Sequence, residues 1–312
     1  MYNFRTDLAS ERREIYQKAN KLENEIDGIE STKEEINENI KVERVKITNE
    51  NGQKAIGKPI GNYITIDVKK LKIAQEEEIE KSSEVLAEEL KKILELHVDK
   101  QGEILVVGLG NIYVTPDSLG PKVINEIDIT RHIIKYLPQY VEEGTRVVSA
   151  ISPGVLGTTG IETVEILKGI VDNINPKLVI VIDALASRSI ERISSTVQLS
   201  DTGIVPGGGV GNTRSEISEG TLGVPVVAIG IPTVVETAVL VNDCLDMFIE
   251  KLQDEAKSNE YLNQLKEEDN YEEIREVLLP KDYNLIVTPK EIDDLIENMK
   301  DIVARGINLA VN

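Results

Sequence analysis

Two short apolar runs, each followed by an aspartate, constrain this chain most. ILVVGLG at residues 104–110 precedes Asp117, and LVIVI at residues 178–182 precedes Asp183. Runs of β-branched and aliphatic residues of this length are typical of strands buried in a parallel sheet. In open α/β sheets, ligands and chemistry collect at the carboxyl ends of the strands. We therefore expect Asp117 and Asp183 to share one site.

The stretch between the first run and Asp117 favours a close-packed turn. In GLGN, Gly108 and Gly110 allow a tight turn and close backbone approach, and Asn111 can hydrogen-bond back to the chain. A nucleotide-binding loop is poorly supported, because the third glycine of a dinucleotide fingerprint is missing. The phosphate-binding pattern GxxxxGK followed by Ser or Thr is also absent.

Two carboxyls that share a proton can activate a water molecule and protonate a leaving group. We therefore interpret Asp117 and Asp183 as a candidate catalytic pair that needs no metal and no cofactor. A structural interpretation also stays open, in which Asp117 caps a helix and Asp183 caps a loop. Loops nearby could bind substrate or hold an oxyanion. The candidate residues in these loops are Gly110, Asn111, Ser152, Gly154 and Arg214.

The order of patterns along the chain predicts an α/β fold. Strands are expected near 103–108, 145–150, 178–183 and 225–230, and helices over 120–136, 160–173 and 234–253. This βαβ series indicates a three-layer αβα architecture of the phosphorylase/hydrolase-like type, with a mainly parallel or mixed sheet. We expect one globular unit, in which residues 101–312 form the catalytic core and residues 8–100 an N-terminal elaboration packed on it.

The N-terminal third has a different pattern. Residues 5–27 have roughly helical spacing, and residues 76–96 form an amphipathic helix. Residues 40–73 alternate as antiparallel strands, with a turn at Asn51-Gly52.

The last helix is expected to begin with Thr288 as N-cap and Pro289 in the first position. Glu291 completes a capping box, and the helix runs to about Ala304, with Gly306 able to end it. Residues 198–223 form a glycine-rich insertion, for which a substrate loop, a subunit contact and plain disorder all stay open.

Five motifs in order resemble the germination protease family of endospore formers, also called GPR endopeptidases. They are RTDLASE at residues 5–11, GLGNIYVTPDSLGP at 108–121, TRH at 130–132, SPGVLGTTGIET at 152–163 and VIDALAS at 181–187. The resemblance covers nearly the whole chain, from about residue 4 to the C-terminus. It implies an atypical aspartic endopeptidase that degrades small acid-soluble spore proteins during germination. The two essential aspartates of the family fall on Asp117 and Asp183.

The same resemblance implies a zymogen that removes its own N-terminus, and a homotetramer. It places the cut between Asp7 and Leu8, after an acidic and before an aliphatic residue, so that residues 1–7 are a propeptide. The uncut segment could cover the site, and we expect little activity on protein substrates from the full-length chain. The location implied is the cytoplasm of the developing forespore, later the spore core.

Composition agrees with an enzyme of a reducing compartment. The single cysteine, Cys244, allows no intrachain disulfide, and its setting predicts a buried helix face. No signal peptide or transmembrane helix is expected, since no apolar run is long enough. The net charge of −20 argues against direct binding of nucleic acid.

Other functions are less well supported by the sequence. The core also resembles hydrogenase maturation endopeptidases, which use a metal in their substrate, but that family lacks the N-terminal 100 residues. A zinc site is poorly supported because the two histidines, His97 and His132, are far apart. A non-enzymatic alternative is an acidic oligomeric binding protein whose aspartates only cap loops.

Overall fold

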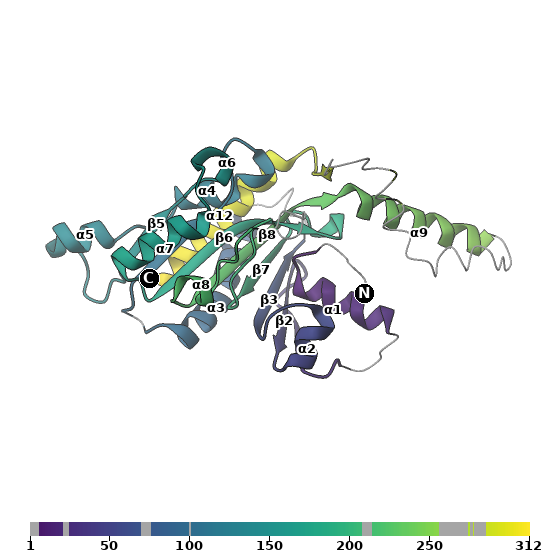
Figure 1. Ribbon diagram of the computed structural model, residues 1–312, viewed down its shortest axis with the longest axis horizontal. Coiled ribbons are helices and arrows are strands. Elements are labelled where there is room, and N and C mark those ends of the chain that lie inside the picture. Colours follow the sequence, from purple (N-terminus) through teal and green to yellow (C-terminus); the bar gives the residue numbers. More distant parts are fainter. Residues whose placement is uncertain are drawn as a thin grey trace.

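The computed structural model describes residues 6–20, 25–69, 76–99, 101–207, 214–255, 274, 277 and 285–312. The described strands form one mixed sheet in the order β1-β2-β3-β7-β8-β6-β4-β5, with β9 paired to β8 (Figure 1). The strands are β1 (Ile29–Glu35), β2 (Ile40–Ile47), β3 (Gly61–Val68), β4 (Ile104–Gly108), β5 (Val148–Ile151), β6 (Leu178–Ser187), β7 (Thr196–Ser200), β8 (Val226–Glu236) and β9 (Ile286–Val287). The longer helices are α1 (Ala9–Ala19), α3 (Glu76–His97), α7 (Thr163–Ile174), α9 (Thr237–Glu255) and α12 (Ile292–Val311). The shorter ones are α2 (Glu50–Ile56), α4 (Leu119–Ile124), α5 (Arg131–Tyr136), α6 (Leu156–Thr159), α8 (Glu219–Leu222) and the 3-10 turns η2 (Thr115–Asp117), η3 (Pro138–Tyr140) and η4 (Ile190–Arg192).

The sheet combines a parallel and an antiparallel half. Strands β5, β4, β6 and β8 pair in parallel, and β1, β2, β3 and β7 continue the same sheet by antiparallel pairing. The expected mixed α/β sheet with an antiparallel N-terminal part is confirmed. Because β3 pairs with β7, the N-terminal strands extend the core sheet.

Alternate side chains of the central strands lie in different cores. On β4, Ile104 and Val106 belong to the core that includes α3, α4 and α12, whereas Leu105 and Val107 pack with α7 and α8. All four are essentially buried, as a strand covered on both faces requires. This arrangement gives the three layers that the apolar runs predicted, and Figure 1 shows α12 and α7 beside the sheet.

Two expected elements differ because a residue forms hydrogen bonds that the sequence pattern did not reveal. The helix expected over 120–136 is two helices, α4 and α5, since Thr130 leaves the helical path to join β5. The Thr130 N–H donates to the Val148 carbonyl (3.0 Å), and the Val148 N–H donates to the Thr130 hydroxyl (2.8 Å). The turn expected at Asn51-Gly52 lies inside α2, because the Asn49 side chain caps that helix by accepting from both N–H groups.

The last helix begins later and ends later than expected. The Thr288 hydroxyl donates to the Thr233 carbonyl (2.9 Å) and caps nothing, so α12 begins at Ile292. The helix continues through Gly306 to Val311. A Cβ on Gly306 would lie 2.7 Å from the Leu86 side chain, so this glycine permits close packing of α12 on α3.

The glycine-rich insertion also begins later than residue 198. Gln198 to Ser200 are part of the buried strand β7, paired with β3 and β8. Residues 208–213, which include three of the insertion's glycines, lie outside the described residues.

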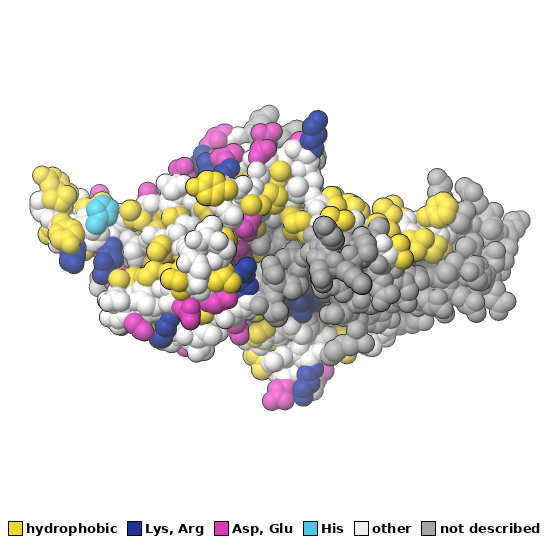
Figure 2. Space-filling model, turned by 45° about the horizontal axis from the view of Figure 1, so that its top comes forward, with side chains coloured by type: hydrophobic (Ala, Val, Ile, Leu, Met, Phe, Trp, Pro, Cys, Tyr) yellow, Lys and Arg dark blue, Asp and Glu magenta, His cyan; other side chains and the backbone are white. Residues whose placement is uncertain are grey.

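Exposed apolar side chains gather at two extremities of the molecule, along α9 and around α5 and the turn after it (Figure 2). Tyr136 and Tyr140 are 70% and 76% exposed, and Met247 on α9 is 70% exposed. Cys244 on the same helix is exposed, so the prediction of a buried position was wrong. On this helix Met247 and Phe248 are exposed as well, whereas Ala238, Val239 and Ile249 are buried. No helix among the described residues is long and apolar enough to span a membrane.

Candidate active site

Asp183 lies where the parallel sheet narrows. Strand β4 pairs with β6 only up to Gly108 and Ile182, whereas β6 continues to Ser187 beside β8. Asp183 therefore follows the last β4 pair, although it does not end its own strand as the sequence suggested. Its side chain is 5% exposed, and one of its oxygens accepts a hydrogen bond from the Ala184 N–H (3.0 Å).

Asp117 reaches the same edge through the turn that follows β4. The Asn111 N–H lies 2.9 Å from Oδ2 of Asp117 and 3.0 Å from its main-chain carbonyl oxygen, which closes the loop. Gly110 has φ +110°, and a Cβ there would lie 2.1 Å from that carbonyl oxygen. Only glycine fits at this position. The close approach predicted for GLGN is confirmed, since a Cβ on Gly108 would lie 2.2 Å from the Gly120 carbonyl oxygen.

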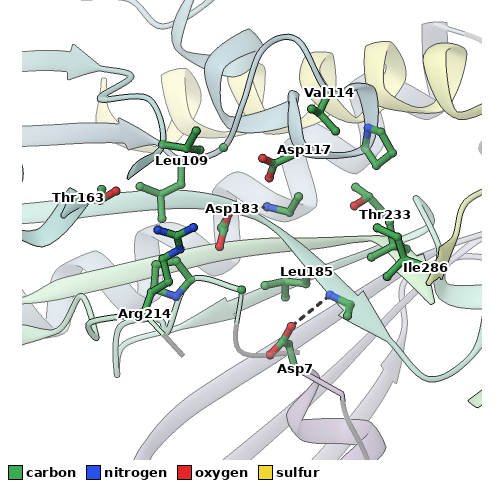
Figure 3. A pocket seen from close by; sticks show the side chains of 18 of the residues that line it. Asp7, Leu109, Val114, Asp117, Thr163, Asp183, Leu185, Arg214, Thr233 and Ile286 are labelled. Carbon is green, nitrogen blue, oxygen red and sulfur yellow. Dashed lines mark hydrogen bonds between the residues drawn. The ribbon is translucent and has the colours of Figure 1, made fainter. Parts of the chain in front are cut away.

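The two aspartates line one cavity of about 290 Å³. Figure 3 shows the side chains of Asp117 and Asp183 converging there with the guanidinium of Arg214, while Asp7 lies beyond Leu185. Apolar side chains, among them Leu109 and Val114, form much of the remaining wall. The cavity is thus a cleft with a few convergent charges, which is typical of binding and catalytic sites.

The surroundings of the two carboxyls raise their pKa values by different amounts. Burial raises the pKa of Asp183 well above its usual value, and the negative charges of Asp117 and Asp7 raise it further. Burial also raises the pKa of Asp117, but the Asn111 N–H and the positive charge of Arg214 oppose that rise. The proton of a singly protonated pair therefore belongs mainly to Asp183, and the pair titrates as a unit.

The structure brings some of the predicted loop residues to the cavity and leaves others out. Gly110, Gly154 and Arg214 line it. Ser152 is exposed and lies outside the lining. The Asn111 N–H already donates to Asp117, so in this conformation it holds the carboxylate and is not free for an oxyanion.

The N-terminal segment lies against the same site. Asp7 lines the cavity and pairs with Ala186 on β6: its N–H donates to the Ala186 carbonyl (3.2 Å), and its Oδ2 accepts from the Ala186 N–H (3.1 Å). Leu8 is fully buried, and Thr6 before it is buried as well. The chain on both sides of the Asp7–Leu8 bond is therefore held against the sheet.

One residue that the sequence did not single out contacts both sides of this bond. The side-chain amide of Gln198 donates to the Asp7 carbonyl (3.2 Å), and its oxygen accepts from the Ala9 N–H (2.7 Å). Gln198 is 7% exposed on β7. The alternation of TVQLS could have revealed a strand with one inward polar residue, but the glycines that follow hid it.

Among the described residues, no group of three or more His, Cys, Asp or Glu side chains is placed to hold a metal ion.

Comparison with known proteins identifies the family. The germination protease family model matches residues 6–265 and 252–312. The chain belongs to the germination protease family. It is therefore a peptidase of spore germination. A germination protease of Caldanaerobacter subterraneus is 49% identical, with 98% of this chain and 94% of the relative covered. That of Clostridium acetobutylicum is 48% identical, with 100% and 96% covered. That of Bacillus cereus is 41% identical, with 100% and 94% covered.

A solved structure is similar to part of the chain. It is a [NiFe] hydrogenase maturation protease, HycI, from Thermococcus kodakarensis, at 18% identity and a TM-score of 0.28. The match covers 45% of this chain and 80% of that one.

Proposed function

We propose that this germination protease is an aspartic endopeptidase that uses Asp117 and Asp183 to activate water. The observation that carries the proposal is one cavity lined by two carboxyls, in which the pKa of Asp183 is raised further than that of Asp117. Pairs of titratable groups with pKa values driven apart are how enzymes obtain an acid and a base at one pH.

The roles follow from the surroundings of each carboxyl. Asp117, near Arg214 and bonded by the Asn111 N–H, is ionised and takes a proton from water as the hydroxide attacks the peptide carbonyl carbon. Asp183, more deeply buried, gives its proton to the carbonyl oxygen. Breaking of the C–N bond then returns the oxygen's proton to Asp183 and passes the proton of Asp117 to the leaving amine. Both carboxyls end in their starting states.

The first substrate in this proposal is the chain itself, cut between Asp7 and Leu8. This bond is held by Gln198 on both sides, and Asp7 lines the catalytic cavity. While residues 1–7 remain attached, the segment denies that space to other peptides. The uncut chain is then a zymogen, and residues 8–312 are the mature enzyme.

The protein substrates in this proposal are the small acid-soluble proteins that coat spore DNA, cut after an acidic and before an aliphatic residue. The net charge of −20 opposes binding to the DNA itself, so the coat proteins are engaged without the nucleic acid. The enzyme acts as a homotetramer in the developing forespore and spore core. Residues 1–7 act as the propeptide, and residues 8–100 pack on the catalytic core of residues 101–312.

The test is incubation of the purified chain at mildly acidic and at neutral pH, followed by its mass and N-terminal sequence. We expect loss of residues 1–7, slowed at least about a hundredfold in Asp117→Asn and in Asp183→Asn. The matched control is Asp172→Asn, an exposed carboxyl on α7 that pairs with Lys168. If both active-site variants remain folded and cut themselves at the normal rate, the catalytic pair is wrong. A chain that stays intact, and cuts no spore protein once trimmed to Leu8, favours the binding-protein alternative.

A further inference from the structure

A second cavity, of about 280 Å³, adjoins the candidate active site. Asp7 and Leu185 line both cavities, so the second one lies beside the residue before the proposed scissile bond. Its walls carry two cations, Arg12 and Lys58. The other titratable groups that line it are Tyr63 and Glu216, of which Tyr63 is buried and Glu216 is exposed at the rim.

The backbone on both sides of Lys58 is held in place. Helix α2 ends in the left-handed conformation at Gly57 (φ +64°), and Nη1 of Arg12 donates to the Gly57 carbonyl (3.0 Å). After Lys58, the Pro59 carbonyl accepts a hydrogen bond from the Tyr63 hydroxyl (2.8 Å). Lys58 therefore projects from a turn that is fixed at the residue before it and the residue after it.

Arg12 connects this turn to the N-terminal segment. Its Nε donates to the Thr6 carbonyl (2.9 Å), while Nη1 of the same guanidinium contacts the carbonyls of Ile56 (3.3 Å) and Gly57. One rigid, planar group thus sets the spacing between the end of α2 and the residue that precedes Asp7. A bound peptide that follows the path of residues 6–8 would lie at the same distance from the end of α2.

The charge in this cavity is suited to a carboxylate. Among the described residues, no carboxylate forms an ion pair with the half-buried ammonium of Lys58. Burial and the neighbouring charge of Arg12 lower the pKa of Lys58 to about 8, and the negative charge of Asp7 opposes that fall. Asp7 opposes the lowering of the Arg12 pKa in the same way. A half-buried cation without an ion pair gains most from an incoming negative charge.

We propose that Lys58, positioned by Arg12, forms the subsite that recognises the acidic side chain before the scissile bond. The subsite recognises Asp7 during self-processing, and afterwards it recognises the corresponding aspartate or glutamate of a protein substrate. Arg214, the cation of the first cavity, is assigned to Asp117, whose ionised form it favours. This inference rests on the proposed function, because it requires cleavage after Asp7.

The test is a double-mutant cycle on the full-length chain at mildly acidic pH. Self-cleavage at the Asp7–Leu8 bond is followed by mass for the wild type, Asp7→Asn, Lys58→Met and the double variant. We expect each single change to slow cleavage about tenfold. The double variant should be no slower than the slower single variant, because both changes remove the same interaction.

Two further variants separate charge from folding. Lys58→Arg keeps the positive charge and should cleave within about threefold of the wild-type rate. Lys54→Met removes an exposed lysine of α2 and should leave the rate unchanged. The subsite is overturned if Lys58→Met cleaves at the wild-type rate, if the two losses multiply, or if Lys58→Arg is as slow as Lys58→Met. A wild-type chain that never cuts this bond overturns the proposed function itself, and the subsite with it.

Discussion

The carboxylate of Asp7 accepts a hydrogen bond from the backbone N–H of Ala186, three residues beyond Asp183 (Figure 3). A segment from the start of the chain is thereby fixed to the strand that carries a catalytic candidate. Because it lines the cavity of Asp117 and Asp183, it competes with any other peptide for that space.

We therefore expect the processed chain to digest an unfolded protein substrate at least about tenfold faster than the unprocessed chain. Initial rates measured before self-cleavage begins give the comparison, with the N-terminus checked at each time point. Equal rates for the two forms would show that residues 1–7 do not obstruct the site.

Replacing Asp183 by asparagine should stabilise the protein at neutral pH. Burial places the folded-state pKa of Asp183 above its unfolded value, so the folded protein binds this proton more tightly. The stability from this group is complete below the unfolded pKa and is lost as the pH rises through the folded pKa. We expect Asp183→Asn to raise the free energy of unfolding by roughly 1–3 kcal/mol near pH 7. The gain should shrink towards pH 4 in thermal melts, and a gain independent of pH would contradict this assignment.

The acid limb of the activity profile should depend on Arg214. The positive charge of Arg214 holds the pKa of Asp117 below the value that burial alone would give. Its removal in Arg214→Gln therefore raises that pKa, and the ionised base is lost at a higher pH. Self-cleavage rates measured across the acidic range should therefore begin to fall at a higher pH in Arg214→Gln than in the wild type. Arg131→Gln, which removes the partner of Glu103, serves as the control and should leave the limb in place.

Glu11 should become more important once the chain is cut. In the uncut chain, the Thr6 hydroxyl accepts a hydrogen bond from the Leu8 N–H (3.2 Å) and donates one to the Glu11 carboxylate. Cleavage removes Thr6 and turns the Leu8 nitrogen into an ammonium, three residues before Glu11 on the first turn of α1. A carboxylate at this position can reach back to the start of the helix. We expect Glu11→Gln to destabilise the processed form by about 1 kcal/mol more than the unprocessed form. Chemical denaturation of both forms tests it, and equal losses would exclude the pairing.

Two helical glycines should respond to alanine in opposite directions. Gly306→Ala places a methyl group against Leu86 and should cost about 1–3 kcal/mol, because α12 and α3 must separate or repack. Gly169→Ala on α7 meets no atom within 4 Å and should stabilise the protein by about 0.5–1 kcal/mol. Urea denaturation of both variants gives the comparison. If Gly306→Ala were as stable as the wild type, Gly306 would not limit the packing of these helices.

The central strands and the longest helix of the core could be predicted from the pattern of apolar residues. Fully apolar runs such as LVIVI have few alternatives to a strand covered on both faces, so β4 and β6 were found within a few residues. The amphipathic helix α3 was also confirmed, since its period of apolar positions is unambiguous over 22 residues. Sequence patterns mispredicted helix bounds where a residue contacts a part of the chain that is distant in sequence. Thr130 bonds to β5 in the break between α4 and α5, whereas Gly306 lies inside α12 and leaves room for Leu86.

The candidate site shows the same division. The sequence by itself singled out Asp7, Asp117 and Asp183, because carboxylates that follow apolar runs and the family motifs are local patterns. Only the tertiary structure decided that Gln198 contacts both sides of the Asp7–Leu8 bond and that Lys58 lies beside Asp7. The physical reason is that these contacts join strands and turns from distant parts of the chain. The burial of Asp117, Asp183 and Lys58, which shifts their pKa values, exists only once the sheet and the helices have packed together.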